Sequence, residues 1–309
     1  MRISILYNLY NIFKCINYVI VMRNIIIDGI IFDILENVKT YSIDIETSVR
    51  KYTHYNSKAD DNAKYYFLFE VGTHDAFAHW VFESAIFLQY LKRIEKELNR
   101  KLTLVIKKNP SRTYKSLFFK LLDVDNEITK EDNHYIDNKK DFVHSQQYTP
   151  YEIEENNICI GCRNLTVNNK NIDCGLLRKL LMDFHNTITA NTRIVNKSID
   201  NLILPRNTKE NLVTNDRRID YSKVYRELQN SKYISYNTMD TKDFNDQITL
   251  LTMSKNIFLD YGSSLWVNGF FCKDSNIYVL NDLGQHNIYK GWIEIIKVIL
   301  SNNNKLINM

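Results

Sequence analysis

The chain has 309 residues, 44% of them hydrophobic and 25% charged, which is the balance of a globular protein long enough for two domains. Its formal net charge of +4 lacks the basic excess typical of a nucleic-acid-binding protein, so we expect no nucleic-acid partner. Only 8 Gly and 3 Pro occur, whereas Asn, Ile, Lys and Tyr are common, and this bias indicates an A/T-rich genome.

The first apolar stretch, residues 3–22, contains Lys14 and several asparagines. Its length suits a membrane-spanning helix, although a central lysine is costly there. No small-residue cleavage site follows, as a signal peptide would require. We therefore expect an element of the first domain in a cytoplasmic protein. The alternative is a signal anchor that associates the protein with a membrane.

Apolar runs that alternate with helical patterns begin near residue 65 and indicate parallel βαβ units. In the first half we expect loops and short strands over 123–158, strands at 65–71 and 102–106, and helices at 75–98, 113–122 and 174–191. In the second half we expect strands at 201–204, 232–236, 256–261 and 276–280, and helices at 221–230, at 243–254, from 263 and at 291–300. A polar linker is expected over 191–200. The fold class is therefore α/β, with Rossmann-like domains at 1–195 and 196–309.

The five cysteines are an odd number and do not suggest a disulfide framework. Cys159 and Cys162 form a CxxC motif, with Cys174 and His185 downstream. A zinc site would need a second close pair of ligands to complete the tetrahedron, and Cys174 with His185 is not one. We interpret the cysteines as reduced residues of a strand and a helix, and we predict no metal site.

An anion site is predicted where the strand at 256–261 stops at Gly262. Glycine allows a sharp turn, and Ser263 or Ser264 can cap the helix that begins there. Free backbone amides and the positive end of the helix dipole suit a diphosphate. Many α/β turns carry a similar glycine–serine cap without binding phosphate, and that reading stays open.

Arginines follow the neighbouring strand. Arg206 lies at the tip of the strand at 201–204, where sheets of this class bind their ligands, and Arg217 and Arg218 come next along the chain. The planar guanidinium group can hold two phosphate oxygens at once. The alternative is that these are solvated loop arginines.

A candidate general base lies early in the helix at 75–98. His79 and Glu83 are four residues apart and share a helix face, and Asp75 lies four residues before His79. A carboxylate beside an imidazole holds its tautomer and increases its basicity. We expect His79 to be the base, with Asp75 or Glu83 as alternatives. The structural reading is a histidine that caps or packs the helix.

Taken in order, these segments resemble glycosyltransferase family 61, which includes protein O-GlcNAc transferases acting on EGF domains and plant xylosyl and arabinosyl transferases. The resemblance covers about residues 64–285. The matching segments are Ala78-His79-Trp80-Val81-Phe82-Glu83, Leu204-Pro205-Arg206, Asp216-Arg217-Arg218-Ile219, Asp246-Gln247-Ile248 and Asp260-Tyr261-Gly262-Ser263-Ser264-Leu265-Trp266-Val267-Asn268. The last fits the family's His-Gly-Ala-x-Leu-x-Asn motif.

The resemblance implies a GT-B fold, in which two Rossmann-like domains face a cleft. It also implies inverting transfer of a sugar from a nucleotide sugar, a UDP-sugar, to a hydroxyl of a protein or glycan, with no cofactor and no essential metal. The first domain would hold the acceptor and the second the donor. The candidate donor-binding residues are Arg206, Arg217, Arg218, Tyr261, Gly262, Ser263, Ser264 and Asn268.

Two departures from the family leave alternatives open. Tyr261 stands where the family has histidine, and Ser263 where it has alanine. Tyrosine can donate a hydrogen bond but cannot be the same acid or base. One alternative is therefore a catalytically inactive binding or scaffold protein. Another is a different Rossmann-like enzyme, such as a nucleotide hydrolase or phosphotransferase, although GxGxxG and GxxxxGK[ST] loops are absent.

Overall fold

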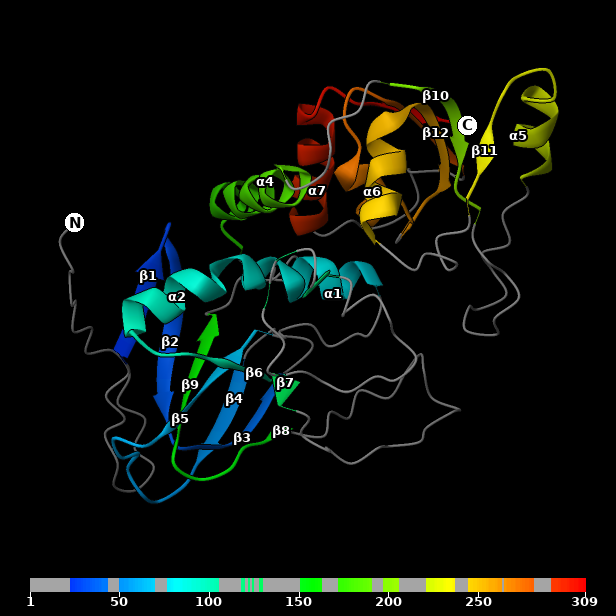
Figure 1. Cartoon of the computed structure of the whole chain (residues 1–309). Coiled ribbons are helices and arrows are strands. Elements are labelled where there is room, and N and C mark those ends of the chain that lie inside the picture. The colour runs from blue at the N-terminus through cyan, green and yellow to red at the C-terminus, as the bar shows by residue number, and fades with distance from the viewer. Residues whose placement is uncertain are drawn as a thin grey trace.

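The computed structural model describes residues 23–43, 50–69, 77–105, 118–119, 122, 124, 128–129, 151–162, 172–190, 197–205, 221–236, 244–262, 264–280 and 290–309. Within these ranges the chain is a mixed α/β protein, and its strands form a six-stranded, a five-stranded and a three-stranded sheet (Figure 1). The predicted α/β class is therefore confirmed. The predicted domain boundary, between 195 and 196, lies outside the described residues.

The six-stranded sheet belongs to the N-terminal half and is only partly parallel. Its strand order is β1 (Arg23–Ile27), β2 (Ile30–Glu36), β9 (Asn157–Cys162), β5 (Lys64–Leu68), β6 (Thr103–Val105) and β7 (Ile128–Thr129). Strands β9, β5, β6 and β7 are parallel, as predicted for βαβ units. Strands β1 and β2 pair antiparallel, and β2 is also antiparallel to β9. The prediction of a parallel Rossmann-like sheet was therefore wrong for this edge of the sheet.

The β1–β2 hairpin has a simple local cause. Its turn is Asp28-Gly29, and both residues have positive φ, 54° and 88°. A two-residue turn with two positive φ values matches the twist of paired strands, and Asp-Gly is a favoured sequence for it.

The three-stranded sheet covers one face of the six-stranded sheet. It consists of β3 (Val38–Ile43), β4 (Arg50–His54) and β8 (Tyr151–Glu152). Val38 and Tyr41 of β3 share a buried cluster with Tyr66, Leu68 and Cys159 of the larger sheet. Asn157 holds the corner because its carboxamide accepts from Val38 N at 3.0 Å and donates to Val38 O at 2.8 Å.

Helices cover the other face of the six-stranded sheet. The single helix predicted at 75–98 is instead α1 (Phe77–Glu83), a 3₁₀ segment η1 (Ala85–Tyr90) and α2 (Leu91–Leu98). The break is at Ser84, whose φ of −133° is not helical. Five of the six η1 residues are buried, so this segment is enclosed on all sides rather than amphipathic.

The five-stranded sheet of the C-terminal half is entirely parallel. Its strand order is β11 (Ile234–Ser235), β10 (Ile199–Ile203), β12 (Ser254–Asp260), β13 (Asn276–Leu280) and β14 (Lys305–Asn308). In chain order this is 2-1-3-4-5, the order of a doubly wound α/β sheet. The strands predicted in this half are confirmed, while β14 was not predicted.

The helices of the C-terminal half lie on opposite faces of this sheet. Helix α5 (Ser222–Glu227) packs on one face, where Val224 meets Ile203 and Phe258. The other face carries α6 (Phe244–Met253), the π-helical segment η4 (Leu265–Gly269) and α7 (Lys290–Ser301).

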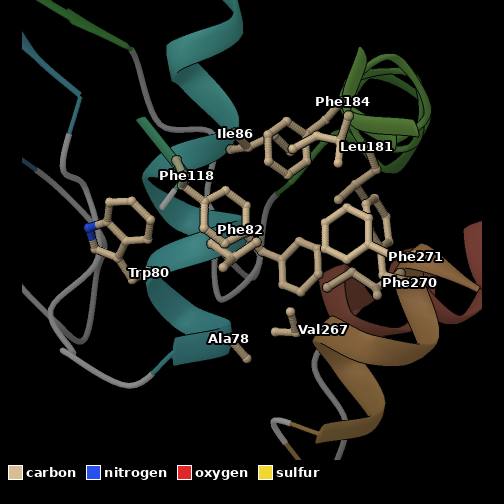
Figure 2. Close-up of a cluster of buried hydrophobic side chains, with 14 of the residues drawn as sticks. Ala78, Trp80, Phe82, Ile86, Phe118, Leu181, Phe184, Val267, Phe270 and Phe271 are labelled. Atoms are coloured by element: carbon tan, nitrogen blue, oxygen red, sulfur yellow. The ribbon is translucent and has the colours of Figure 1, made fainter. Parts of the chain in front are cut away.

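A shared apolar core joins the two halves. Helix α4 (Cys174–Ala190), predicted at 174–191, packs against α7. Figure 2 shows Phe82 of α1 directed toward Phe270 beside η4, and the two ring centroids are 5.0 Å apart. Phe184 of α4 lies 6.3 Å from Phe270. Helices α1, α2, α4, α6 and α7 are thus the middle layer between the six-stranded and the five-stranded sheet, whereas α5 lies outside it (Figure 1).

A buried carboxylate links α4 to α7. Glu294 accepts from Arg178 Nε at 2.6 Å and from Lys297 Nζ at 2.7 Å. Burial is the largest single effect and acts to raise the pKa of Glu294, but the hydrogen bonds and charges of these two cations together outweigh it and lower the pKa. The carboxylate therefore stays charged between the layers.

Among the described residues, no helix is long and apolar enough to cross a bilayer. The apolar stretch at 3–22, our candidate signal anchor, lies outside them.

Candidate functional site

The described parts of two predicted donor segments, Leu204-Pro205 and Asp260-Tyr261-Gly262, lie at the point where the five-stranded sheet reverses its winding. From β10 the chain goes to the edge strand β11 and then returns to the other side of β10 as β12. Strands β10 and β12 stay paired up to the carboxyl end of β10, because Leu204 N donates to Phe258 O at 2.9 Å. Ligands of doubly wound sheets bind outside the carboxyl ends of the strands at this position. Here those ends lead into Arg206 and into Tyr261-Gly262.

The turn at Gly262 is confirmed. Gly262 has a φ of 109°, a backbone conformation that side-chain-bearing residues rarely adopt. The helical segment follows at once, with Trp266 N donating to Gly262 O at 3.0 Å. Tyr261 N donates to Leu280 O at 3.2 Å, which ties the turn to β13.

Buried amides support the start of η4. Gln247 of α6 donates from Nε2 to Asn268 Oδ1, and Asn268 donates from Nδ2 to Ser264 Oγ at 3.2 Å. Gln247 and Asn268 are only 2% and 3% exposed, whereas Ser264 is half-buried. Asn268, which was predicted to contact the donor, is thus buried. Its side chain is connected to the end of β12 by its hydrogen bond to Ser264.

The predicted His79–Glu83 contact is present. His79 Nδ1 lies 3.2 Å from Glu83 Oε1. The Glu83 side chain is 3% exposed and that of His79 is 28% exposed, so the imidazole reaches solvent while the carboxylate is enclosed. This arrangement fits a carboxylate that orients an accessible imidazole. Asp75, the other carboxylate candidate, lies outside the described residues.

Aromatic rings connect His79 to the β12 strand end. His79 meets Trp292 of α7 with ring centroids 5.1 Å apart and planes at 79°. Trp292 lies 5.1 Å from Trp266, and Trp266 lies 5.7 Å from Tyr261. The structure therefore joins the N-terminal and C-terminal motifs through two tryptophans. The sequence reasoning missed Trp292, since its position on the apolar face of a helix resembles that of any core residue.

Some predicted site residues lie outside the described part of the chain. These are Asp75, Arg206, Arg217, Arg218 and Ser263. Arg206 directly follows Pro205, the last described residue after β10, and Ser263 stands between the described Gly262 and Ser264.

The cysteines occupy the predicted kinds of element. Cys159 and Cys162 lie in β9, and Cys174 begins α4. Residues three apart in a strand face opposite sides, and accordingly Cys159 belongs to the cluster under the three-stranded sheet while Cys162 belongs to the helix-covered core. Within the described ranges, no group of three or more His, Cys, Asp or Glu side chains is arranged to hold a metal ion.

No protein-family model matches the chain, and no curated protein matches it.

Proposed function

We propose that the protein is an inverting glycosyltransferase of the GT-B type that transfers a sugar from a UDP-sugar to a hydroxyl of a protein or glycan. The observation that carries the proposal is the position of the family-like motifs. Leu204-Pro205, which Arg206 follows in the sequence, and Asp260-Tyr261-Gly262 lie at the carboxyl ends of the adjacent strands β10 and β12, where the winding reverses. A doubly wound sheet binds nucleotides at that position.

On the donor side, the leaving diphosphate needs positive groups and hydrogen-bond donors. Arg206, Arg217 and Arg218 supply guanidinium groups, and the backbone amides after Gly262 supply donors at a helix start. Gly262 lets the backbone come close because it has no side chain. The Tyr261 phenol replaces the family's imidazole as a hydrogen-bond donor.

On the acceptor side, inversion needs a base that removes the proton of the attacking hydroxyl. His79 has the exposure and the carboxylate partner for this role. Glu83 is enclosed, which suits it to hold the imidazole rather than to contact an acceptor. Asp75 remains the alternative base. In this scheme the domain at 1–195 holds the acceptor and the domain at 196–309 holds the donor.

The second candidate is a catalytically inactive binding protein with the same fold. Tyr261 favours it, because the phenol cannot take over the acid–base chemistry of the family's histidine. This candidate shares the donor site but predicts no turnover.

A panel of nucleoside diphosphate sugars, scored by melting shift and by hydrolysis or transfer, tests both candidates. We expect a UDP-sugar to raise the melting temperature and to be consumed, since a ligand that binds only the folded state stabilises it. Stabilisation without consumption would favour the inactive candidate. No shift with any nucleotide or nucleotide sugar would contradict both.

A further inference from the structure

The buried amides next to η4 have a defined direction of hydrogen bonding. The amide nitrogen of Gln247 donates to Asn268 Oδ1, so the oxygen of the Asn268 carboxamide faces α6. Its nitrogen therefore faces the other way and donates to Ser264 Oγ. Because an amide nitrogen has hydrogens and no acceptor capacity, Ser264 can only accept in this bond.

The direction of these bonds determines what Ser264 can offer a ligand. One lone pair of its hydroxyl accepts from Asn268, while within the described residues the hydroxyl hydrogen is donated to no other group. Ser264 is half-buried and lies two residues after Gly262 at the end of β12. Its side chain does not cap the helix backbone either. A group that only accepts hydrogen bonds, such as a phosphate oxygen, is the complement of this hydroxyl.

We propose that Gln247 is a positioning residue that acts through Asn268 to present the Ser264 hydroxyl hydrogen to the diphosphate of the donor. The proposal rests on the proposed function, because it assigns part of the same donor site. Gln247 itself touches no ligand and is 2% exposed. Its effect is to keep the Asn268 carboxamide from turning over, which would convert Ser264 from a donor to the ligand into a donor to Asn268.

Two Gln247 variants test this direction. In Gln247→Glu, titrated at a pH high enough to ionise the buried carboxyl, the carboxylate can only accept, so the Asn268 amide nitrogen turns toward it and the amide oxygen takes the Ser264 hydrogen. In Gln247→Met the amide is replaced by an uncharged side chain of similar size, which guards against an effect of buried charge. Leu251→Met, one turn later on α6 and fully buried, is the matched control for repacking of this helix.

Calorimetric titration with UDP and with inorganic pyrophosphate gives the readout. We expect Ser264→Ala and Gln247→Glu each to weaken binding about tenfold or more, the loss typical of a hydrogen bond to a charged group. Gln247→Met should weaken it less, and Leu251→Met should leave it within about twofold. Once Ser264 is alanine, either Gln247 change should have little further effect, because residues that act through one another are not additive.

Contrary outcomes are distinct. A Gln247 effect that persists undiminished in the Ser264→Ala background, or a lower melting temperature with unchanged affinity, would make Gln247 merely structural and overturn the positioning role. Pyrophosphate binding with the expected pattern but no UDP binding would keep that role and remove the nucleotide-sugar function. Wild-type protein that binds neither probe would overturn both.

Discussion

The imidazole of His79 and the indole of Trp292 lie edge to face, with their centroids 5.1 Å apart. His79 belongs to α1 beside the six-stranded sheet, and Trp292 belongs to α7 on the five-stranded sheet. The candidate base is therefore in contact with the half of the chain that carries the candidate donor site. Any shift of α7 against α1 changes the surroundings of His79 directly.

If His79 is the base, His79→Ala should lower turnover by about 10²–10⁴-fold while nucleotide affinity stays nearly constant. Single-turnover rates and melting temperatures measured on the same variant separate catalysis from folding. His54→Ala is the matched control, since His54 lies on β4 of the three-stranded sheet, where its Nδ1 is 2.8 Å from Glu36 O. A folded His79→Ala protein with near-normal turnover would move the role of base to Asp75.

Trp292→Phe should lower the maximal rate more than it changes the KM for the donor. The smaller ring loosens the contacts with His79 and Trp266 but leaves the strand ends in place. We expect a stability cost of about 1–3 kcal/mol from the lost volume, measured by denaturant unfolding.

The control for this change is Trp80→Phe. Trp80 is buried on α1, the helix that also carries His79, but it packs against Phe69, Phe118 and Phe119. An equal loss of rate in Trp292→Phe and Trp80→Phe would show that the effect comes from looser packing of the whole core rather than from the contact of Trp292 with His79.

Sequence reasoning succeeded where one element determines the result. The strand at 276–280 was predicted with the bounds it has, because its apolar run is flanked by polar residues on both sides. The β1–β2 hairpin was missed because a short isoleucine-rich run has no clear period, and its Asp28-Gly29 turn was not read as a hairpin signal.

For the candidate site, the sequence predicted contacts within one helix but not between elements. The His79–Glu83 contact follows from helical spacing alone. The Gln247–Asn268 bond depends on how α6 and η4 rotate against each other, and the His79–Trp292 contact depends on how two sheets stack. A local sequence pattern determines neither the rotation of these helices nor the stacking of the sheets. Both contacts could therefore be identified only from the tertiary structure.

Arg206→Ala should weaken binding of UDP by about 1.5–3 kcal/mol, the range for hydrogen bonds to charged groups. Arg206→Lys should recover only part of this loss, because lysine keeps the charge without the planar fork. Calorimetry measures both. Arg226→Ala, an exposed arginine on α5 of the same half, should leave the affinity unchanged. Unchanged affinity in Arg206→Ala would remove this residue from the donor site.

Acid should destabilise the protein through His185. This residue of α4 is 4% exposed, and burial lowers its pKa to about 4. Lys273 nearby also disfavours its charged form. The unfolded chain has an ordinary imidazole pKa of about 6.5, so it binds more protons than the folded protein between these two values. The free energy of unfolding therefore falls as pH is lowered through this window.

The matched variant is His185→Leu, which cannot be protonated. Relative to it, the wild type should lose up to about 3 kcal/mol of stability between about pH 6.5 and pH 4. Urea unfolding at a series of pH values measures the difference. Parallel stability curves for the two proteins would show that His185 is not the group responsible.

Each half of the chain contains a buried cysteine, Cys162 in the N-terminal half and Cys272 in the C-terminal half. The rate at which each one reacts can therefore be used to measure local opening of its half. Cys162 lies inside the six-stranded sheet, while Cys272 lies beyond η4, where burial raises the pKa of its thiol to about 12. Neither sulfur is reactive while covered, so a thiol reagent modifies it only during a transient exposure. A chain that retains one of these cysteines and no other would report how often its own layer unfolds. The ratio of the two labelling rates would then show whether the halves open together or independently.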